Sequence, residues 1–155
     1  MNVVLYDPGV LPTRLEQFGR AVEFDELLKI SDYVTVHVPL TNETLGMFST
    51  KQFGIMKNDA FFVNTSRGKV VNEPDLMDAL KNRTIAGAAL DVQTSEPLRA
   101  DNPLLELENV IVSPHIASLS REAQAYCDRI VQEDVIRFVK GQTMRFVANP
   151  EVFTK

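Results

Sequence analysis

Short, continuously apolar runs rich in β-branched residues recur along this chain, and they constrain its fold more than any other feature. Several runs are apolar on consecutive rather than alternate residues, which is typical of strands buried on both faces, as in a parallel sheet covered by helices. The runs predict strands at Val3–Tyr6, Tyr33–Val38, Ala60–Asn64, Ile85–Asp91 and Val110–Ser113, and a weaker strand at Ala21–Phe24.

Helical segments lie between these runs. Ser49, Asn72 and Ser120 are candidate N-caps, because their side-chain oxygens can accept a hydrogen bond from a free N–H of the first turn. The predicted helices are Asp25–Ile30, Thr50–Met56, Glu73–Lys81 and about Arg121–Lys140, and Thr94–Leu107 is predicted to be a long loop. This alternation of strands and helices predicts an α/β fold with a Rossmann-like parallel sheet.

Composition excludes several classes of partner. The formal charge of −5 offers no basic surface for nucleic acid or anionic lipid, and no apolar run reaches the roughly 18 residues of a membrane helix. Cys127 is the only cysteine, which excludes an intramolecular disulfide or a thiolate zinc cluster, so we expect no metal site. A reducing cytoplasm is the natural setting for such a chain.

Chemically versatile side chains follow the predicted strands closely. Asp7 ends the first strand, Arg67 follows the third, Asp91 ends the fourth and His115 follows the fifth, and Glu96 lies in the loop after Asp91. Because right-handed crossovers bring the carboxyl ends of parallel strands to one edge, where such sheets bind ligands, we expect these groups to share one site.

Each residue also has a plainer interpretation. Asp7 can accept hydrogen bonds from ribose hydroxyls and would repel a 2′-phosphate, favouring NAD over NADP, but Asp7-Pro8-Gly9 can also be only a turn. Arg67 can hold a carboxylate through two hydrogen bonds, or it can be a surface arginine. His115 can transfer a proton if Glu96 orients its ring; otherwise His115 is structural and Glu96 is a solvated loop acid.

Five ordered stretches resemble the D-isomer-specific 2-hydroxyacid dehydrogenase family, which includes phosphoglycerate, glycerate and D-lactate dehydrogenases. The resemblance runs from about residue 3 to residue 140. The stretches are Tyr6-Asp7-Pro8, Val36-His37-Val38-Pro39-Leu40 with Thr44 beyond it, Asn64-Thr65-Ser66-Arg67-Gly68, Ala88-Ala89-Leu90-Asp91-Val92 continuing through Glu96-Pro97-Leu98, and Ser113-Pro114-His115-Ile116-Ala117-Ser118.

The resemblance implies a role for each matching position. Arg67 would bind the carboxylate and carbonyl oxygen of a small 2-oxo acid, His115 would exchange a proton with that oxygen, and Glu96 would pair with His115. It implies an NAD site in which Asp91, Ala117 and Ser118 lie near the nicotinamide, with Arg67 and His115 beside it. The further residues that would line the NAD site are Asp7, Val38, Pro39, Thr44, Thr65 and Ser66. It also implies a homodimer.

One departure from the family is large: the chain contains no Gly-x-Gly. The phosphate loop would precede the strand ending in Asp7 by about 20 residues. We therefore expect a partial NAD-binding domain over residues 1–141 and a C-terminal tail over residues 142–155. The strands Val3–Tyr6 and Tyr33–Val38 then lack the common neighbour of the usual strand order. Three outcomes stay open: the two strands pair directly, another chain supplies the strand, or the fragment is only marginally stable. We expect this chain alone to bind NAD weakly and to turn over little substrate.

Two alternatives to a dehydrogenase fragment remain open. The chain can be a non-catalytic NAD-sensing interaction protein, or an inactive truncated gene product. The sequence also leaves open which 2-hydroxy acid would be the substrate.

Overall fold

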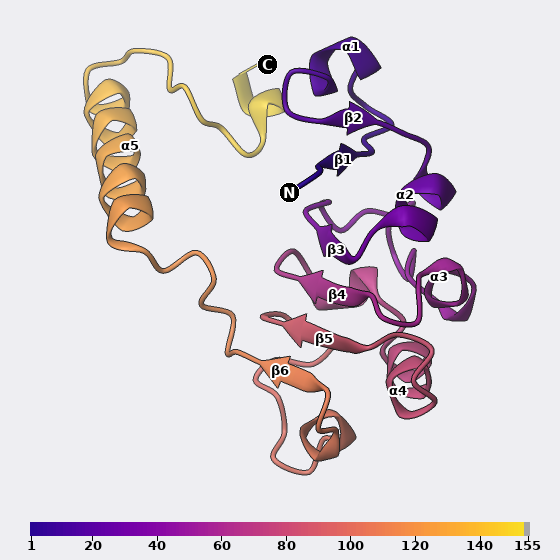
Figure 1. Cartoon of the computed structure of the whole chain (residues 1–155). Helices are drawn as coiled ribbons and strands as arrows, with labels where there is room; N and C mark the ends of the chain where they lie inside the picture. Colours follow the sequence, from indigo (N-terminus) through magenta and orange to yellow (C-terminus); the bar gives the residue numbers. More distant parts are fainter. Residues whose placement is uncertain (154–155) are drawn as a thin grey trace. The chain divides into compact units, whose positions relative to one another are not determined.

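A computed structural model describes residues 1–153 and divides the chain into two compact units, Met1–Ile116 and Ala117–Lys155. Figure 1 colours the chain from indigo at its N-terminus to yellow at its C-terminus. The two units are described separately below. Within the described residues, no helix has both the length and the apolar character needed to cross a membrane.

The first unit contains a four-stranded parallel sheet in the order β3-β4-β5-β6 (Figure 1). These strands are Tyr33–Val36, Phe61–Asn64, Gly87–Leu90 and Val110–Val112. Their register aligns Val36 with Asn64 and Asn64 with Leu90, so the carboxyl ends of β3, β4 and β5 are level. The predicted Rossmann-like parallel sheet is therefore confirmed, with strands one to three residues shorter than the apolar runs.

Two more strands, β1 (Val4–Leu5) and β2 (Arg20–Ala21), form a separate parallel pair. The N–H groups of Arg20 and Val22 donate to the carbonyl oxygens of Val3 and Leu5, both at 3.0 Å. Backbone groups alternate in direction along a strand, so those of Val4 face the other edge of β1. Within residues 1–153, β1 has no strand partner except β2, and β3 has none except β4. The two strands expected to lack a common neighbour do not pair directly.

Helices α2 (Phe24–Ile30), α3 (Thr50–Ile55) and α4 (Glu73–Lys81) lie on one side of the strands in Figure 1. The α4 helix has the predicted bounds, and its N-cap Asn72 accepts a hydrogen bond from the Asp75 N–H at 3.3 Å. The sequence did not predict α1 (Pro12–Leu15) or the 3-10 helices η1 (Gly68–Val70), η2 (Pro103–Glu106) and η3 (Pro150–Phe153). The prediction of a loop over Thr94–Leu107 was wrong in part, since η2 lies within that segment.

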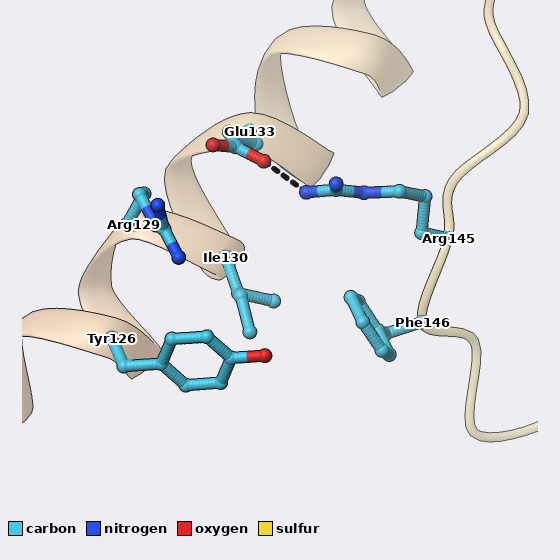
Figure 2. A pocket seen from close by; sticks show the side chains of 6 residues that line it. All are labelled: Tyr126, Arg129, Ile130, Glu133, Arg145 and Phe146. Carbon is cyan, nitrogen blue, oxygen red and sulfur yellow. Dashed lines mark hydrogen bonds and ion pairs between the residues drawn. The ribbon is translucent and has the colours of Figure 1, made fainter. Parts of the chain in front are cut away.

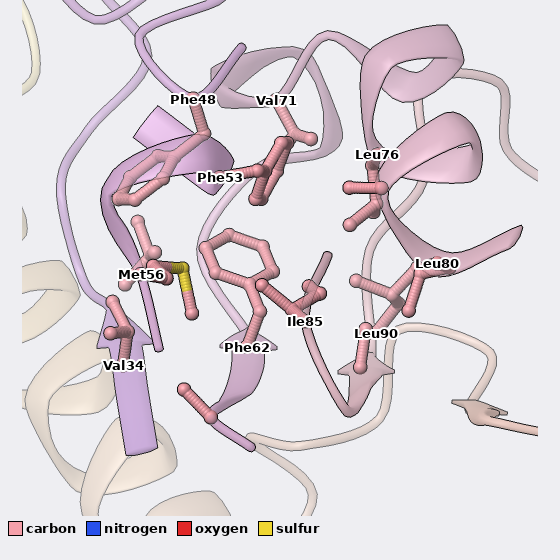
Figure 3. Packing of buried hydrophobic residues seen from close by; sticks show 14 of the residues in the cluster. Val34, Phe48, Phe53, Met56, Phe62, Val71, Leu76, Leu80, Ile85 and Leu90 are labelled. Atoms are coloured by element: carbon pink, nitrogen blue, oxygen red, sulfur yellow. The ribbon is translucent and has the colours of Figure 1, made fainter. Parts of the chain in front are cut away.

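The hydrophobic core lies between the four-stranded sheet and these helices, as Figure 3 shows. Phe62 of β4 is fully buried, and its ring centroid lies 4.9 Å from that of Phe48 and 5.4 Å from that of Phe53. The predicted burial of strands on both faces is wrong for β3, where Val34 is buried but Tyr33 is 67% exposed. Alternation of this kind means that only one face of β3 packs on the core.

The second unit contains α5 (Arg121–Val139), which Ser120 caps by accepting from the Ala123 N–H at 3.0 Å, and a tail that returns along the helix. The buried Asp134 carboxylate accepts from the backbone N–H groups of Arg145 and Phe146 at 3.0 and 2.9 Å, and these bonds lower the pKa of Asp134. Arg145 also pairs with Glu133 beside a pocket of about 150 Å³ (Figure 2). The domain boundary predicted at residue 141 stays a prediction.

Candidate functional site

The loop that carries Arg67 is fixed by a buried amide at the end of β4. Asn64 is 1% exposed, and its Oδ1 accepts from the N–H and the hydroxyl of Ser66, both at 3.0 Å. Its Nδ2 donates to the carbonyl oxygen of Arg67 at 3.0 Å. Because each described bond of this amide goes to the loop, Thr65, Ser66 and Arg67 are held at the carboxyl end of the sheet. The exposed Arg67 guanidinium donates to the Ser66 carbonyl oxygen at 2.7 Å.

A glycine brings this loop against the loop that follows β5. A β-carbon added to Gly68 would lie 1.9 Å from the carbonyl oxygen of Gln93 and 2.5 Å from the backbone nitrogen of Thr94. No side chain fits in that space, so only glycine allows the two backbones to approach so closely. The approach places the Arg67 loop beside the segment that leads to Glu96.

Asp91, at the end of β5, supports the segment that carries His115. The Asp91 side chain accepts from the Ser113 hydroxyl at 2.5 Å and from the Ile116 N–H at 2.9 Å, and the Asp91 backbone carbonyl accepts from the His115 N–H at 2.8 Å. His115 has a φ of 55°, in the left-handed region that residues other than glycine seldom occupy. Hydrogen bonds on both sides of His115 hold this conformation in place.

Glu96 and His115 form the central contact of the site. Glu96 Oε2 lies 2.8 Å from His115 Nδ1. The hydrogen bond from His115 is the largest of the effects that lower the pKa of the Glu96 carboxyl, and the positive charge of Arg67 contributes in the same direction. A carboxylate at Nδ1 leaves Nε2 as the ring nitrogen available to a ligand. Both side chains are partly exposed, His115 at 44% and Glu96 at 36%, so solvent and small solutes can reach the pair.

The structure therefore brings together Arg67, Glu96 and His115, which come from the segments that follow three different strands. Asp91 is part of the same arrangement, although its described bonds go to the protein backbone and to Ser113. Sequence reasoning gave no role to Asn64 or Ser113. A polar residue at the end of a buried strand is the signal that could have identified Asn64.

The other predicted residues lie in less specific surroundings. Asp7 follows β1, and its Oδ1 accepts from the Gly9 N–H at 2.8 Å, which is the turn that the sequence also allowed. Thr44 donates to the Pro39 carbonyl oxygen at 2.6 Å, so its hydroxyl orders the loop after β3, where Val38 is half-buried. Ala117 and Ser118 belong to the second unit. The cofactor contacts predicted for these residues stay predictions.

Comparison with known proteins gives concordant matches. Residues 1–117 match the family described as D-isomer specific 2-hydroxyacid dehydrogenase, NAD binding domain. The chain is 47% identical over 150 residues to a D-3-phosphoglycerate dehydrogenase of Archaeoglobus fulgidus, covering 96% of this chain and 28% of that protein. It is 43% identical over 157 residues to a glyoxylate reductase of Korarchaeum cryptofilum, covering 98% of this chain and 46% of that protein.

Solved structures share the fold. The crystal structure of a D-lactate dehydrogenase with NAD+ from Lactobacillus jensenii matches with a TM-score of 0.85 and 32% identity, covering 95% of this chain and 48% of that one. The chain thus spans between about a quarter and half of the length of these relatives.

Proposed function

The chain belongs to the D-isomer specific 2-hydroxyacid dehydrogenase family, in its NAD-binding domain, and from this premise we propose that it supplies the acid–base and substrate-binding groups of an NAD-dependent oxidoreductase acting on a small 2-hydroxy or 2-oxo acid. The observation that carries the proposal is the 2.8 Å contact between Glu96 and His115, with the charge of Arg67 acting on the same carboxylate.

In this proposal each of the three side chains has one task. Arg67, which is always charged, binds the substrate carboxylate through paired N–H donors. Protonated His115 donates a proton from Nε2 to the substrate carbonyl oxygen during reduction, and neutral His115 accepts the hydroxyl proton at Nε2 during oxidation. Glu96 holds the ring by Nδ1, so that Nε2 is the nitrogen left to meet the substrate.

NAD, when bound, supplies or accepts the hydride. The described residues fit such a cofactor in part. Thr65, Ser66 and Asp91 follow strands of the four-stranded sheet at its carboxyl end, where ligands bind in this class of fold, and Asp7 follows β1 of the two-stranded sheet. An acid at the position of Asp7 favours NAD over NADP. The Gly-x-Gly that would present backbone N–H groups to the pyrophosphate is not among the 155 residues.

A chimera tests the proposal directly. The 150 matching residues of the Archaeoglobus fulgidus D-3-phosphoglycerate dehydrogenase are replaced by those of this chain, and NADH oxidation is followed with glyoxylate, hydroxypyruvate and pyruvate. We expect turnover with at least one of these acids. His115→Gln should then lower kcat by roughly 10²–10⁴-fold, the usual contribution of positioned acid–base catalysis. Arg67→Lys should mainly raise KM, because a lysine cannot form the paired donor contact.

Glu106→Gln is the matched control for Glu96→Gln, because Glu106 is an exposed acid of the same loop region with no predicted role. Glu96→Gln should lower kcat, whereas Glu106→Gln should leave it unchanged. A folded chimera that binds NADH but turns over none of the acids would favour the alternative, a non-catalytic NAD-sensing protein. Equal effects of the two glutamine substitutions would reject the role of Glu96.

We also propose that the protein acts as a homodimer in the cytoplasm. The family resemblance supports the homodimer, and the single cysteine supports a reducing compartment. Light scattering coupled to size-exclusion chromatography measures the mass of the chimera. A monomeric mass at micromolar concentration would count against the dimer.

A further inference from the structure

Gln93, three residues after β5, is a buried polar residue to which neither the sequence motifs nor the proposed chemistry assigns a role. Its exposed fraction is 6%. Its Nε2 donates to the carbonyl oxygen of Leu90 at 3.1 Å and to that of Ser113 at 3.3 Å. Both partners are acceptors only, so the nitrogen and not the oxygen of the amide must face them. The side chain thus ties the end of β5 to the segment that follows β6.

The backbone of the same residue binds the Glu96 carboxylate. The Gln93 N–H donates to Glu96 Oε1 at 3.0 Å, and the other oxygen of Glu96 contacts His115 Nδ1 at 2.8 Å. Ser113, which the Gln93 side chain holds, lies two residues before His115. Gln93 therefore contacts the partner of the imidazole through its backbone and the segment carrying the imidazole through its side chain.

The third segment of the site also meets Gln93. The carbonyl oxygen of Gln93 occupies the space that a β-carbon on Gly68 would need, immediately after Arg67. Gln93 thus contacts all three parts of the site. Its N–H binds Glu96, its side-chain amide binds Ser113, and its carbonyl group lies against Gly68. A displacement of Gln93 would move the supports of Arg67, Glu96 and His115 together.

From these contacts, and on the premise of the proposed function, we infer that Gln93 is a positioning residue for the Glu96–His115 pair. Its amide fixes the distance between the loop after β5 and the loop after β6, and so holds the carboxylate within hydrogen-bonding reach of Nδ1. Gln93 need not touch the substrate or NAD. Removal of its amide leaves the Leu90 and Ser113 carbonyl groups without this donor and loosens the link between the two loops.

The tautomer of His115 reports this role without any measurement of activity. A carboxylate at Nδ1 selects the neutral ring that carries its proton on Nδ1, whereas a free imidazole favours the proton on Nε2. Long-range ¹H–¹⁵N correlation spectra distinguish the two forms. The sequence has only two histidines, and His37 contacts Thr35 Oγ1 through Nε2 at 2.9 Å, so its signals serve as an internal reference.

The test compares three versions of the full 155-residue chain at a pH where the rings are neutral. The parent should show His115 mainly with the proton on Nδ1. Gln93→Leu, which keeps the backbone N–H and removes the amide, should lower the Nδ1–H fraction at least twofold. Gln17→Leu is the matched control, because Gln17 donates to the Arg14 carbonyl oxygen from an exposed position, and it should leave both rings unchanged.

Each outcome decides a separate point. An unchanged His115 tautomer in a natively folded Gln93→Leu variant overturns the role of Gln93 and leaves the Glu96–His115 pair intact. A parent that lacks the Nδ1–H form overturns both this inference and the pair on which the proposed function depends. Circular dichroism monitors folding. If Gln93→Leu does not fold, the His115 tautomer is measured in Gln93→Met, whose side chain is closer in shape to glutamine, and the same outcomes apply.

Discussion

The close approach at Gly68 gives the most quantitative prediction. An added β-carbon would lie 1.9 Å from the Gln93 carbonyl oxygen and 2.0 Å from its carbonyl carbon. Ordinary contact begins near 3.4 Å, so in Gly68→Ala one of the two backbones must retreat by roughly 1.5 Å. Overpacking that forces off-rotamer side chains and small backbone shifts costs about 1–3 kcal/mol, and occasionally more. A clash with backbone atoms cannot be relieved by a rotamer change, so we expect a loss of about 3 kcal/mol or more.

Gly54 provides the matched control. It lies in α3, and a β-carbon there would meet no atom within 4 Å. Gly54→Ala should therefore stabilise the chain by about 0.5–1 kcal/mol, because alanine loses less backbone entropy than glycine in a helix. For a chain of this size, 1 kcal/mol corresponds to about 2–4 °C in Tm, so Gly68→Ala should lower Tm by roughly 6–12 °C.

Thermal unfolding followed by circular dichroism measures both glycine variants, and urea titration gives the free energies. A Tm for Gly68→Ala within about 2 °C of the parent would refute the argument, because it would mean that the loops after β4 and β5 are not in the described contact. A fall of Tm in Gly54→Ala as large as that in Gly68→Ala would refute it as well, since the effect would then not come from the clash.

Three further predictions concern the pair, the core and the cofactor. The folded-state pKa of Glu96 is lowered from its ordinary value near 4.5, so its contribution to stability is present above that value and is lost as the pH falls through the folded-state pKa. The drop in urea midpoint between pH 6 and pH 3 should therefore be smaller in Glu96→Gln than in the parent; an equal drop would contradict the hydrogen bond to His115. Phe62→Ala should cost about 3–5 kcal/mol in urea unfolding because the ring is fully buried, and a loss below about 1 kcal/mol would contradict the described core. Calorimetric titration of the 155-residue chain with NAD should give a dissociation constant weaker than micromolar, and micromolar binding would contradict the importance of the pyrophosphate-binding N–H groups.

The parallel sheet could be predicted because each of its strands is marked by a short apolar run in the local sequence. Each apolar run is short, and each strand was found within three residues of its predicted ends. The α4 helix was predicted with its observed bounds, since Asn72 caps it and Pro74 fits its first turn. The short helices α1 and η2 were missed because four residues show no helical periodicity. The exposure of Tyr33 was missed because a run of apolar residues does not tell which face packs.

The site was predicted only where a strand end or a family motif marked it. Glu96 and His115 are 19 residues apart, and their expected contact came from the shared sheet edge together with the resemblance. Gln93 escaped notice because its side-chain partner in the loop after β6 is 20 residues away. The residues around Gln93 in the sequence do not predict that its side-chain amide is buried. Such a role depends on which backbone lies opposite in the fold, and one sequence does not contain that information.

The edges of β1 and β3 that have no strand partner within residues 1–153 affect the two halves of the proposed function differently. The hydrogen bonds that hold Arg67, Glu96 and His115 join residues between Asn64 and Ile116, on β4, β5, β6 and their loops. The acid expected to select NAD, Asp7, follows β1 in the other sheet. Because the four-stranded sheet has its own core, the acid–base pair can keep its geometry while NAD binds weakly. The His115 tautomer and the NAD titration should therefore give independent results, and a change in the Nδ1–H fraction of His115 when NAD is added would show that the two halves are coupled.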